Sequence, residues 1–335
     1  MQALAQIRSK KPASCPDQSI YAQYACGKLG LSFSDLDGGS GQVFSVASKT
    51  KQMHFAAGRC SWYPQNNATA ATLASDKYFT NVVLEHAGVA TLGGDYFFLH
   101  ERHRAHRPSG HEIEDALRYF VKLGPTAFVK PLMGSRGDFA QAIYGEAALK
   151  NYIPEVSRYY DAILIQPVVS GDEYRIFLLD DEVLYTARKH PPFVVGDGKR
   201  SIRDILIEHN SGLRARGLSP AALDAEREQS LDRILPEGER WELSGRMNLS
   251  AGGNMVLETA PSDAMAIVAR NAARALGLRV AAVDLFTNIS GEPDRTAVIE
   301  INSSPSIRIL EESGRADLIL KIWHHTFSAV GLLGV

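Results

Sequence analysis

Two stretches near the carboxyl end of the chain carry side chains suited to binding a hard metal ion. Glu300 and Asn302 lie two residues apart in VIEIN, so an extended backbone would point both side chains to one face. Asp284 interrupts the apolar run VAAVDLF, where a carboxylate is costly unless it is paired or bound to metal. Carboxylate and amide oxygens are the ligands that Mg²⁺ prefers. If the two strands are neighbours, Asp284, Glu300 and Asn302 form a magnesium site.

These three residues also have a simpler explanation. Asp284 could cap a turn, and Glu300 could face solvent from an edge strand. For any single acidic residue this explanation is the better one. The metal site is favoured because several stretches upstream agree with it.

A lysine and a glycine-containing loop upstream are suited to binding phosphate. Lys130 lies in the apolar stretch AFVKP, and the loop that follows contains Gly134 and Gly137. Glycines let backbone N–H groups approach phosphate oxygens, and a lysine supplies a point charge. The loop lacks the GKS or GKT ending of a Walker motif. By itself it could be an ordinary turn with Lys130 facing solvent.

Charged residues follow a turn at Gly171. Glu173 and Arg175 share one face of the next expected strand. The carboxylate could bind ribose hydroxyls, and the arginine could bind phosphate or orient a carboxylate; the alternative is a cross-strand ion pair. Arg188 and Lys189 end the following strand, where surface charge is the simpler explanation.

The glycine-rich stretch from Asn248 to Gly253 could hold a phosphate or an oxyanion, although most such stretches are only turns. No serine or histidine has the partner spacing of a catalytic triad. The chemistry therefore points to electrostatic positioning of phosphates and not to covalent catalysis.

Apolar periodicity predicts the elements that position these residues. The expected strands are 42–47, 52–57, 96–99, 127–131, 162–166, 173–179, 182–188, 280–286 and 298–302. The expected helices are 70–88, 113–123, 146–153, 202–209, much of 211–240, 263–276 and 318–330. Strands 173–179 and 182–188 should form a hairpin across Asp180 and Asp181.

Composition narrows the functional classes. The 335 residues are 45% hydrophobic and 22% charged, which allows two or three subdomains. The formal net charge of -2 gives no reason to expect binding to nucleic acid or to an anionic membrane. Cys15, Cys26 and Cys60 are scattered, which favours a reducing, cytoplasmic environment. We expect no signal peptide and no membrane span.

Taken in order, these stretches resemble the ATP-grasp superfamily. The order is DK on a helix, FVKP with its glycine loop, LIQPVVSGDEYRIF, a strand ending AR, NLSAGG, VAAVDLF and VIEINSSPS. The stretch from EYRIF to SIRDIL and the stretch NLSAGG are most similar to the ATP-grasp modules of cyanophycin synthetase and bifunctional glutathione synthetase. The resemblance covers about Ala71 to Ile309. Each motif alone is loose, but their joint order is specific.

The resemblance implies an α+β / α/β architecture, the ATP-grasp fold, in which two α+β subdomains clamp a nucleotide. The expected division is a small N-terminal α/β domain at 1–70, a central and lid subdomain at 71–167, and a C-terminal subdomain with the metal site at 168–335.

The resemblance also implies roles for individual residues. For ATP, Lys77 and Lys130 would contact the phosphates, and the lid over them would be formed by Gly134, Ser135 and Gly137. The adenine would be lined by Gln166, Pro167, Val168 and Val169, and the ribose would be bound by Glu173.

One or two Mg²⁺, with Mn²⁺ as an alternative, would be held by Asp284, Glu300 and Asn302. The catalytic residues, which stabilise the transferred phosphoryl group, would be Arg188, Asn248 and Lys130.

Three features depart from the family pattern. Gln166 stands where glutamate is commoner, which weakens the adenine assignment but leaves backbone contacts. The lid carries Arg136 and Asp138 and not only small residues. The domains that accompany these modules in the two similar synthetases are not recognised, so we expect neither cyanophycin polymerisation nor complete glutathione synthesis.

The expected activity is that of an ATP-dependent carboxylate–amine ligase acting through an acyl phosphate on amino-acid or peptide substrates. Two alternatives are an ATP-binding regulatory or scaffold module of the same fold, and a kinase that stops at the phosphorylated substrate. The oligomeric state stays open, with a homodimer as one expected assembly because dimers are common among similar proteins.

Overall fold

The computed structural model describes residues 1–57, 61–134, 137–215, 223, 225–243, 254–258 and 260–334. The helices are α1 (Gln2–Ser9), α2 (Asp17–Leu29), α3 (Ala68–Ser75), α4 (Lys77–His86), α5 (Ile113–Leu123), α6 (Glu146–Val156), α7 (Ile202–Ala215), α8 (Ala225–Glu228), α9 (Asp263–Leu276), α10 (Arg308–Glu312) and α11 (Ala316–Ala329). No helix in the described ranges is long and apolar enough to cross a membrane.

The strands form antiparallel sheets. They are β1 (Ser32–Asp35), β2 (Val43–Ala47), β3 (Gln52–Ala56), β4 (Asp95–Phe98), β5 (Thr126–Pro131), β6 (Gln141–Tyr144), β7 (Ala162–Gln166), β8 (Asp172–Leu179), β9 (Glu182–His190), β10 (Phe193–Val195), β11 (Arg240–Glu242), β12 (Asn254–Glu258), β13 (Val280–Thr287) and β14 (Ala297–Asn302). Their orders are β1-β2-β3, β4-β7-β5-β6, β12-β9-β8-β13-β14 and the pair β10-β11.

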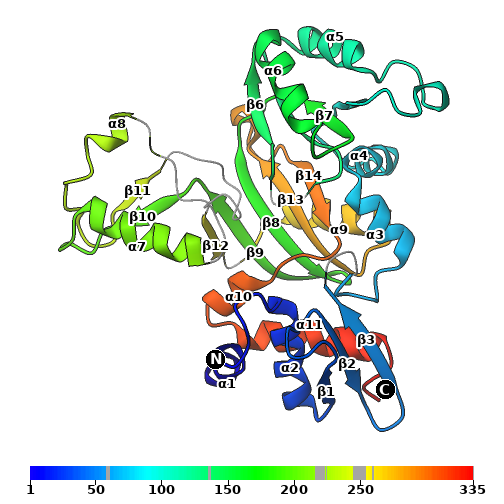
Figure 1. The fold of residues 1–335 in the computed structure, drawn as a ribbon, viewed down its shortest axis with the longest axis vertical. Helices are drawn as coiled ribbons and strands as arrows, with labels where there is room; N and C mark the ends of the chain where they lie inside the picture. The colour runs from blue at the N-terminus through cyan, green and yellow to red at the C-terminus, as the bar shows by residue number, and fades with distance from the viewer. Residues whose placement is uncertain are drawn as a thin grey trace.

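The four-stranded sheet is covered on one face by α5 and α6, at the top of Figure 1. Phe97, Val129 and Ile163 alternate toward these helices and are buried. The intervening residues, among them Phe128 and Lys130, point to the opposite face because side chains alternate along a strand. That second face meets the five-stranded sheet at a cavity.

The five-stranded sheet packs one face on α9, α3 and α4. Ile176, Val283 and Leu285 lie in this layer together with Ala269 of α9. Ser262 caps the start of α9, and Gly277 ends it in the left-handed conformation with φ of 74°, which glycine adopts without strain. The predicted helix and its end are confirmed.

The N-terminal segment shares a core with the last helix, at the bottom of Figure 1. Phe55 of β3 lies edge-on to Trp323 of α11, with ring centroids 5.8 Å apart, and Phe44 stacks on Phe55 at 5.2 Å. Packing therefore crosses the expected boundary at residue 70, since residues from both ends of the chain build one core. The division into domains stays a prediction.

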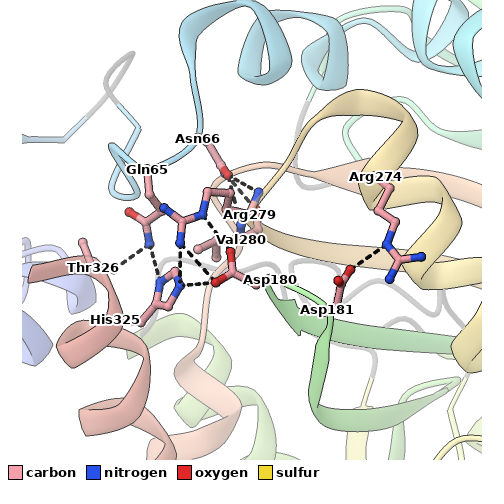
Figure 2. A network of polar contacts seen from close by, with 9 residues as sticks. All are labelled: Gln65, Asn66, Asp180, Asp181, Arg274, Arg279, Val280, His325 and Thr326. Carbon is pink, nitrogen blue, oxygen red and sulfur yellow. Dashed lines mark hydrogen bonds and ion pairs between the residues drawn. The ribbon is translucent and has the colours of Figure 1, made fainter. Parts of the chain in front are cut away.

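A network of polar contacts joins four separate segments (Figure 2). Asn66 accepts hydrogen bonds from the backbone N–H groups of Arg279 and Val280 at 2.8 and 3.0 Å. Its amide nitrogen donates to the carbonyls of Val280 and Ser303 at 2.8 and 2.9 Å. At the β8–β9 turn, the Asp180 carboxylate lies between Arg279 and His325 of α11. The network fixes the loop before α3 against the strands that carry the candidate metal ligands.

Two of the expected helices differ from the structure. The helix expected over 70–88 is broken into α3 and α4 at Asp76, whose carboxylate accepts from the N–H groups of Tyr78 and Phe79, both at 2.9 Å. This N-cap starts a new helix because it satisfies the free amides of the first turn. The helix expected over much of 211–240 is found only in part where the structure describes it: α7 continues to Ala215, and 225–243 holds the short helix α8 and the strand β11.

Candidate functional site

A cavity of about 490 Å³ lies between the four-stranded and the five-stranded sheet. Most of the site residues expected from the sequence line it. They are Lys77, Lys130, Gly134, Gly137, Gln166, Pro167, Val168, Val169, Glu173, Asp284, Glu300 and Asn302. Residues more than two hundred positions apart therefore meet in one space, and the volume is within the range of small-molecule sites, about 300–1,000 Å³.

Lys130 places a cation in this cavity without a direct ion pair in the described part of the chain. The residue is 5% exposed, and the described part of the chain offers its ammonium group no hydrogen-bond partner or ion pair. Burial lowers the Lys130 pKa to about 8, although the carboxylate of Glu300 opposes the change. A buried, unpaired ammonium is destabilising by itself, so it favours binding of an anion.

Lys77 reaches the same space from the first turn of α4. Its ammonium group donates to the carbonyls of Gly134 and Leu132 at 3.0 and 3.4 Å. Burial lowers the Lys77 pKa, with Glu300 and Asp76 acting in the opposite direction. The break at Asp76 places Lys77 at the start of α4, where the helix dipole also favours an anion.

Asp284 is paired from two sides. Arg175 donates to both carboxylate oxygens at 2.7 Å, and Lys189 donates to one of them at 2.9 Å. Burial opposes the Asp284 anion, but Arg175 and Lys189 outweigh it and hold the Asp284 pKa well below its usual range. The cross-strand ion pair left open for Arg175 is thus formed, and the arginine orients a carboxylate.

Lys189 is a site residue that the sequence reasoning missed. It is 9% exposed, lines the cavity and also donates to Glu173. Burial opposes its charge, yet Asp284 and Glu173 raise the Lys189 pKa above its ordinary value. With Lys77 and Lys130, Lys189 brings a third ammonium group to the cavity.

A register shift explains why Lys189 and not Arg188 faces the cavity. The β8–β9 hairpin begins with Leu179 opposite Glu182, but a bulge between Phe177 and Leu178 moves the later pairs by one residue. Tyr174 therefore pairs with Arg188, and both point away from the cavity. Arg188 donates to Asp172 at 2.5 Å and lies over the Tyr174 ring at 5.7 Å. The local sequence of an apolar strand does not indicate where a bulge occurs.

The candidate metal ligands meet on adjacent strands. Asp284 pairs with Glu300 across β13 and β14, and the Asn302 amide nitrogen donates to Glu300 at 3.3 Å. No three His, Cys, Asp or Glu side chains in the described ranges cluster as a metal site, so a three-ligand site at the expected residues would also need the amide oxygen of Asn302.

The donor set fits a hard divalent cation at Glu300 and Asn302, which supply a carboxylate and an amide oxygen. Asp284 fits less simply because both of its oxygens already accept from cations. It would join as a ligand where Lys189, whose stem is flexible, gives up its contact.

The end of β7 forms the third wall of the cavity. Gln166 donates from its amide nitrogen to the carbonyl of Gly93 at 2.5 Å, while its side-chain oxygen is buried without a partner in the described part of the chain. Pro167, Val168 and Val169 follow and line the same wall with Phe286. An apolar wall of this kind can hold a flat ring.

Two of the expected site residues, Ser135 and Asn248, lie outside the described residues. Arg188 is described but is not brought to the cavity. The roles assigned to all of the site residues stay predictions.

Comparison with solved structures identifies the fold. A bifunctional glutathione synthetase from Pasteurella multocida matches with a TM-score of 0.61 over 93% of this chain and 44% of that chain, at 19% identity. This fold is the ATP-grasp fold. The expected ATP-grasp fold is confirmed, with several antiparallel sheets in a mixed α and β architecture.

Distant relatives share part of this ATP-grasp sequence. A glutathione biosynthesis bifunctional protein of Streptococcus mutans is 30% identical over 232 residues, which are 60% of this chain and 30% of that protein. A cyanophycin synthetase of Trichormus variabilis is 28% identical over 264 residues, 71% of this chain and 27% of that protein. The chain thus spans about a third of the length of the curated relatives it matches. The sequence matches no protein-family model.

Proposed function

We propose that the protein is an ATP-dependent carboxylate–amine ligase that forms a peptide or amide bond through an acyl phosphate. Amino acids or short peptides are its substrates. The ATP-grasp fold and the relatives that make glutathione or cyanophycin support this reading at the level of the superfamily. The choice of reaction for this chain rests on the cavity.

The buried ammonium group of Lys130 carries the proposal. It faces a cavity that also holds Lys77, Lys189 and the carboxylate of Glu300. Such a cavity suits a polyanion together with a divalent cation, which is the chemistry of a metal–nucleotide complex. Lys130 and Lys77 would contact phosphate oxygens, and the wall from Gln166 to Val169 would hold the adenine.

Glu173 would bind the ribose hydroxyls in this arrangement. In the structure, its carboxylate accepts from Lys189. Nucleotide binding would therefore exchange this contact for a hydroxyl, and Lys189 would become available to a phosphate oxygen. Mg²⁺ held by Glu300, Asn302 and Asp284 would neutralise charge on the phosphates.

The reaction has two steps. A carboxylate oxygen of one substrate attacks the terminal phosphorus, the bond to the bridging oxygen breaks and ADP leaves. The amine of the second substrate then attacks the acyl carbon, phosphate leaves and the amine loses a proton. Lysine ammonium groups stabilise the transferring phosphoryl group, and exclusion of water protects the acyl phosphate.

The proposal is tested by ADP and phosphate release from Mg²⁺-ATP over a matrix of paired amino acids and short peptides, with mass spectrometry of the products. A ligase needs two substrates and yields a mass equal to their sum less one water. A stable phosphorylated product formed with one substrate would make the protein a kinase. Nucleotide binding without ADP release across the matrix would favour the binding module.

A further inference from the structure

Lys189 bridges two carboxylates to which the proposed function gives different roles. Its ammonium group donates to Glu173, the candidate ribose ligand, and also to Oδ2 of Asp284, the candidate metal ligand, at 2.9 Å. The Asp284 side chain is fully buried, and that of Glu173 is 14% exposed. Because little solvent reaches these contacts, the two ion pairs are screened less than pairs on the surface.

The lysine reaches Asp284 across the strand that lies between them. In the five-stranded sheet, β8 separates β9, which carries Lys189, from β13, which carries Asp284. Tyr174 of β8 pairs with Arg188 of β9, so Glu173 and Lys189 come next along the two strands. Neighbouring strands are about 4.8 Å apart, and a contact across a whole strand therefore needs a side chain as long as lysine.

Both carboxylate oxygens of Asp284 already accept hydrogen bonds from cations. Arg175 donates to the two oxygens at 2.7 Å, and Lys189 donates to one of them. A divalent cation at this carboxylate would lie next to two positive groups, which repel it. Arg175 is held by two parallel hydrogen bonds, whereas Lys189 makes one contact to Asp284 at the end of a flexible stem. Lys189 is therefore the group that a metal ion displaces.

We propose that Lys189 occupies Asp284 in place of the divalent cation, so that the protein binds the cation weakly until a nucleotide draws the ammonium group away. This inference rests on the proposed function, which places the cation at Asp284, Glu300 and Asn302. A phosphate oxygen of the nucleotide gives Lys189 another acceptor, and Asp284 then becomes available to the metal. Lys189 is thus a positioning residue, which acts on the metal through Asp284.

The exchange links the binding of the cation to the binding of the nucleotide. A nucleotide that removes Lys189 from Asp284 strengthens cation binding, and by thermodynamic linkage the cation strengthens nucleotide binding by the same factor. An uncharged side chain at position 189 would remove the competitor. The affinity for the cation should then be higher even when no nucleotide is present.

The test is titration of the nucleotide-free protein with Mn²⁺, in which the electron paramagnetic resonance signal measures the free ion. Mn²⁺ is a suitable probe because it prefers the same oxygen ligands as Mg²⁺. We expect Lys189→Met to bind Mn²⁺ at least about 10-fold more tightly than the wild type. Equal or weaker binding in Lys189→Met would overturn the proposal, and so would the absence of Mn²⁺ binding to this variant.

Arg188→Met is the matched control for the loss of one positive charge. Arg188 is the preceding residue of the same strand, but it contacts Asp172 and is not among the residues that line the cavity. Its Mn²⁺ affinity should stay close to that of the wild type. A gain as large as that of Lys189→Met would show a general effect of charge and would overturn the proposal. Lys189→Gln also removes the charge but keeps a polar group, and it repeats the comparison if Lys189→Met does not fold.

A double variant locates the competition at Asp284. Adding Asp284→Asn to Lys189→Met removes the carboxylate that the loss of the lysine made available. The gain in Mn²⁺ affinity should therefore disappear in the double variant. A double variant that keeps the full gain while remaining folded would contradict the proposed competition at Asp284.

The Mn²⁺ titration contains no nucleotide, so its outcome separates this inference from the proposed function. A gain in Lys189→Met, together with no binding of Mg²⁺-ATP to the wild type, would disprove the nucleotide site and retain the competition at Asp284. No gain in Lys189→Met, together with ADP release by the wild type, would retain the ligase and disprove the role of Lys189.

Discussion

A buried lysine without a direct ion pair raises the free energy of the folded protein, and Lys130 is such a residue in the described part of the chain. Its folded pKa is about 8, below the ordinary value of 10.5. Between these values the unfolded chain binds more protons than the folded chain, so stability rises with pH through this window. At pH values below the folded pKa, both the folded and the unfolded chain carry the charged lysine, so the free energy of folding includes the full cost of burying that charge.

Lys130→Met should therefore stabilise the free protein by about 3 kcal/mol at neutral pH. The difference from the wild type should fall to zero as the pH rises above the ordinary lysine value. Urea unfolding at several pH values measures it. Equal stabilities at neutral pH would mean that Lys130 has a counter-ion in solution.

Lys189 and Arg188 are adjacent residues whose side chains point to opposite faces of one strand. Lys189→Met removes a partner of the buried Asp284 and should lower the free energy of unfolding by about 3 kcal/mol. Arg188→Met removes a half-exposed ion pair with Asp172 and should cost less than about 1 kcal/mol. Urea unfolding of the two variants compares them, and equal losses would contradict the register shift within the β8–β9 hairpin.

The metal-ligand candidates were accessible to sequence reasoning, whereas Lys189 was not. Glu300 and Asn302 share a face because side chains alternate, and Asp284 stands out in an apolar run. The face on which Lys189 lies depends on a one-residue register shift within the hairpin. Strand pairing and not local composition sets such a shift.

At the scale of the elements, the break between α3 and α4 matters most for the site. It turns one expected helix into two and places Lys77 at a helix start. The apolar spacing of 70–88 fits one continuous helix almost as well, so only the capping preference of Asp76 could have indicated the break. Most of the other helices and strands, where described, lie close to the ranges expected from periodicity.

Asp76→Ala should lower the free energy of unfolding by about 1 kcal/mol, because the N–H groups of Tyr78 and Phe79 lose their acceptor. It should also weaken ATP binding, since Lys77 follows directly. Asp76→Asn keeps a capping oxygen and is the control. Thermal unfolding and calorimetric titration measure the two effects; unchanged values in Asp76→Ala would show that the cap is unimportant.

At the scale of the whole molecule, the two ends of the chain build one core and one cavity wall. Trp323 of α11 packs on Phe55, and Asn66 holds both β13 and the turn after β14. Contacts between residues so far apart in the sequence leave no trace in local patterns. For this reason the sequence indicated a separate N-terminal cap but not its role in fixing the site.

Asn66→Ala should destabilise the protein by about 3 kcal/mol, because it leaves the buried N–H and carbonyl of Val280 and part-buried backbone groups of Arg279 and Ser303 unpaired. Arg274→Ala, which removes an exposed ion pair with Asp181 in the same region (Figure 2), is the control and should leave the stability unchanged. Chemical denaturation compares them. Equal stability of the two variants would contradict the proposed anchoring.

The central claim is that the cavity between the two sheets binds Mg²⁺-ATP through Lys130 and Glu300. Calorimetric titration of Mg²⁺-ATP into the wild type, Lys130→Met and Glu300→Gln tests it most directly. We predict that the wild type binds and that each variant binds at least about 10-fold more weakly while remaining folded, because each loses a charged contact to the complex. Equal affinity in the three folded proteins would contradict the claim and place the nucleotide elsewhere.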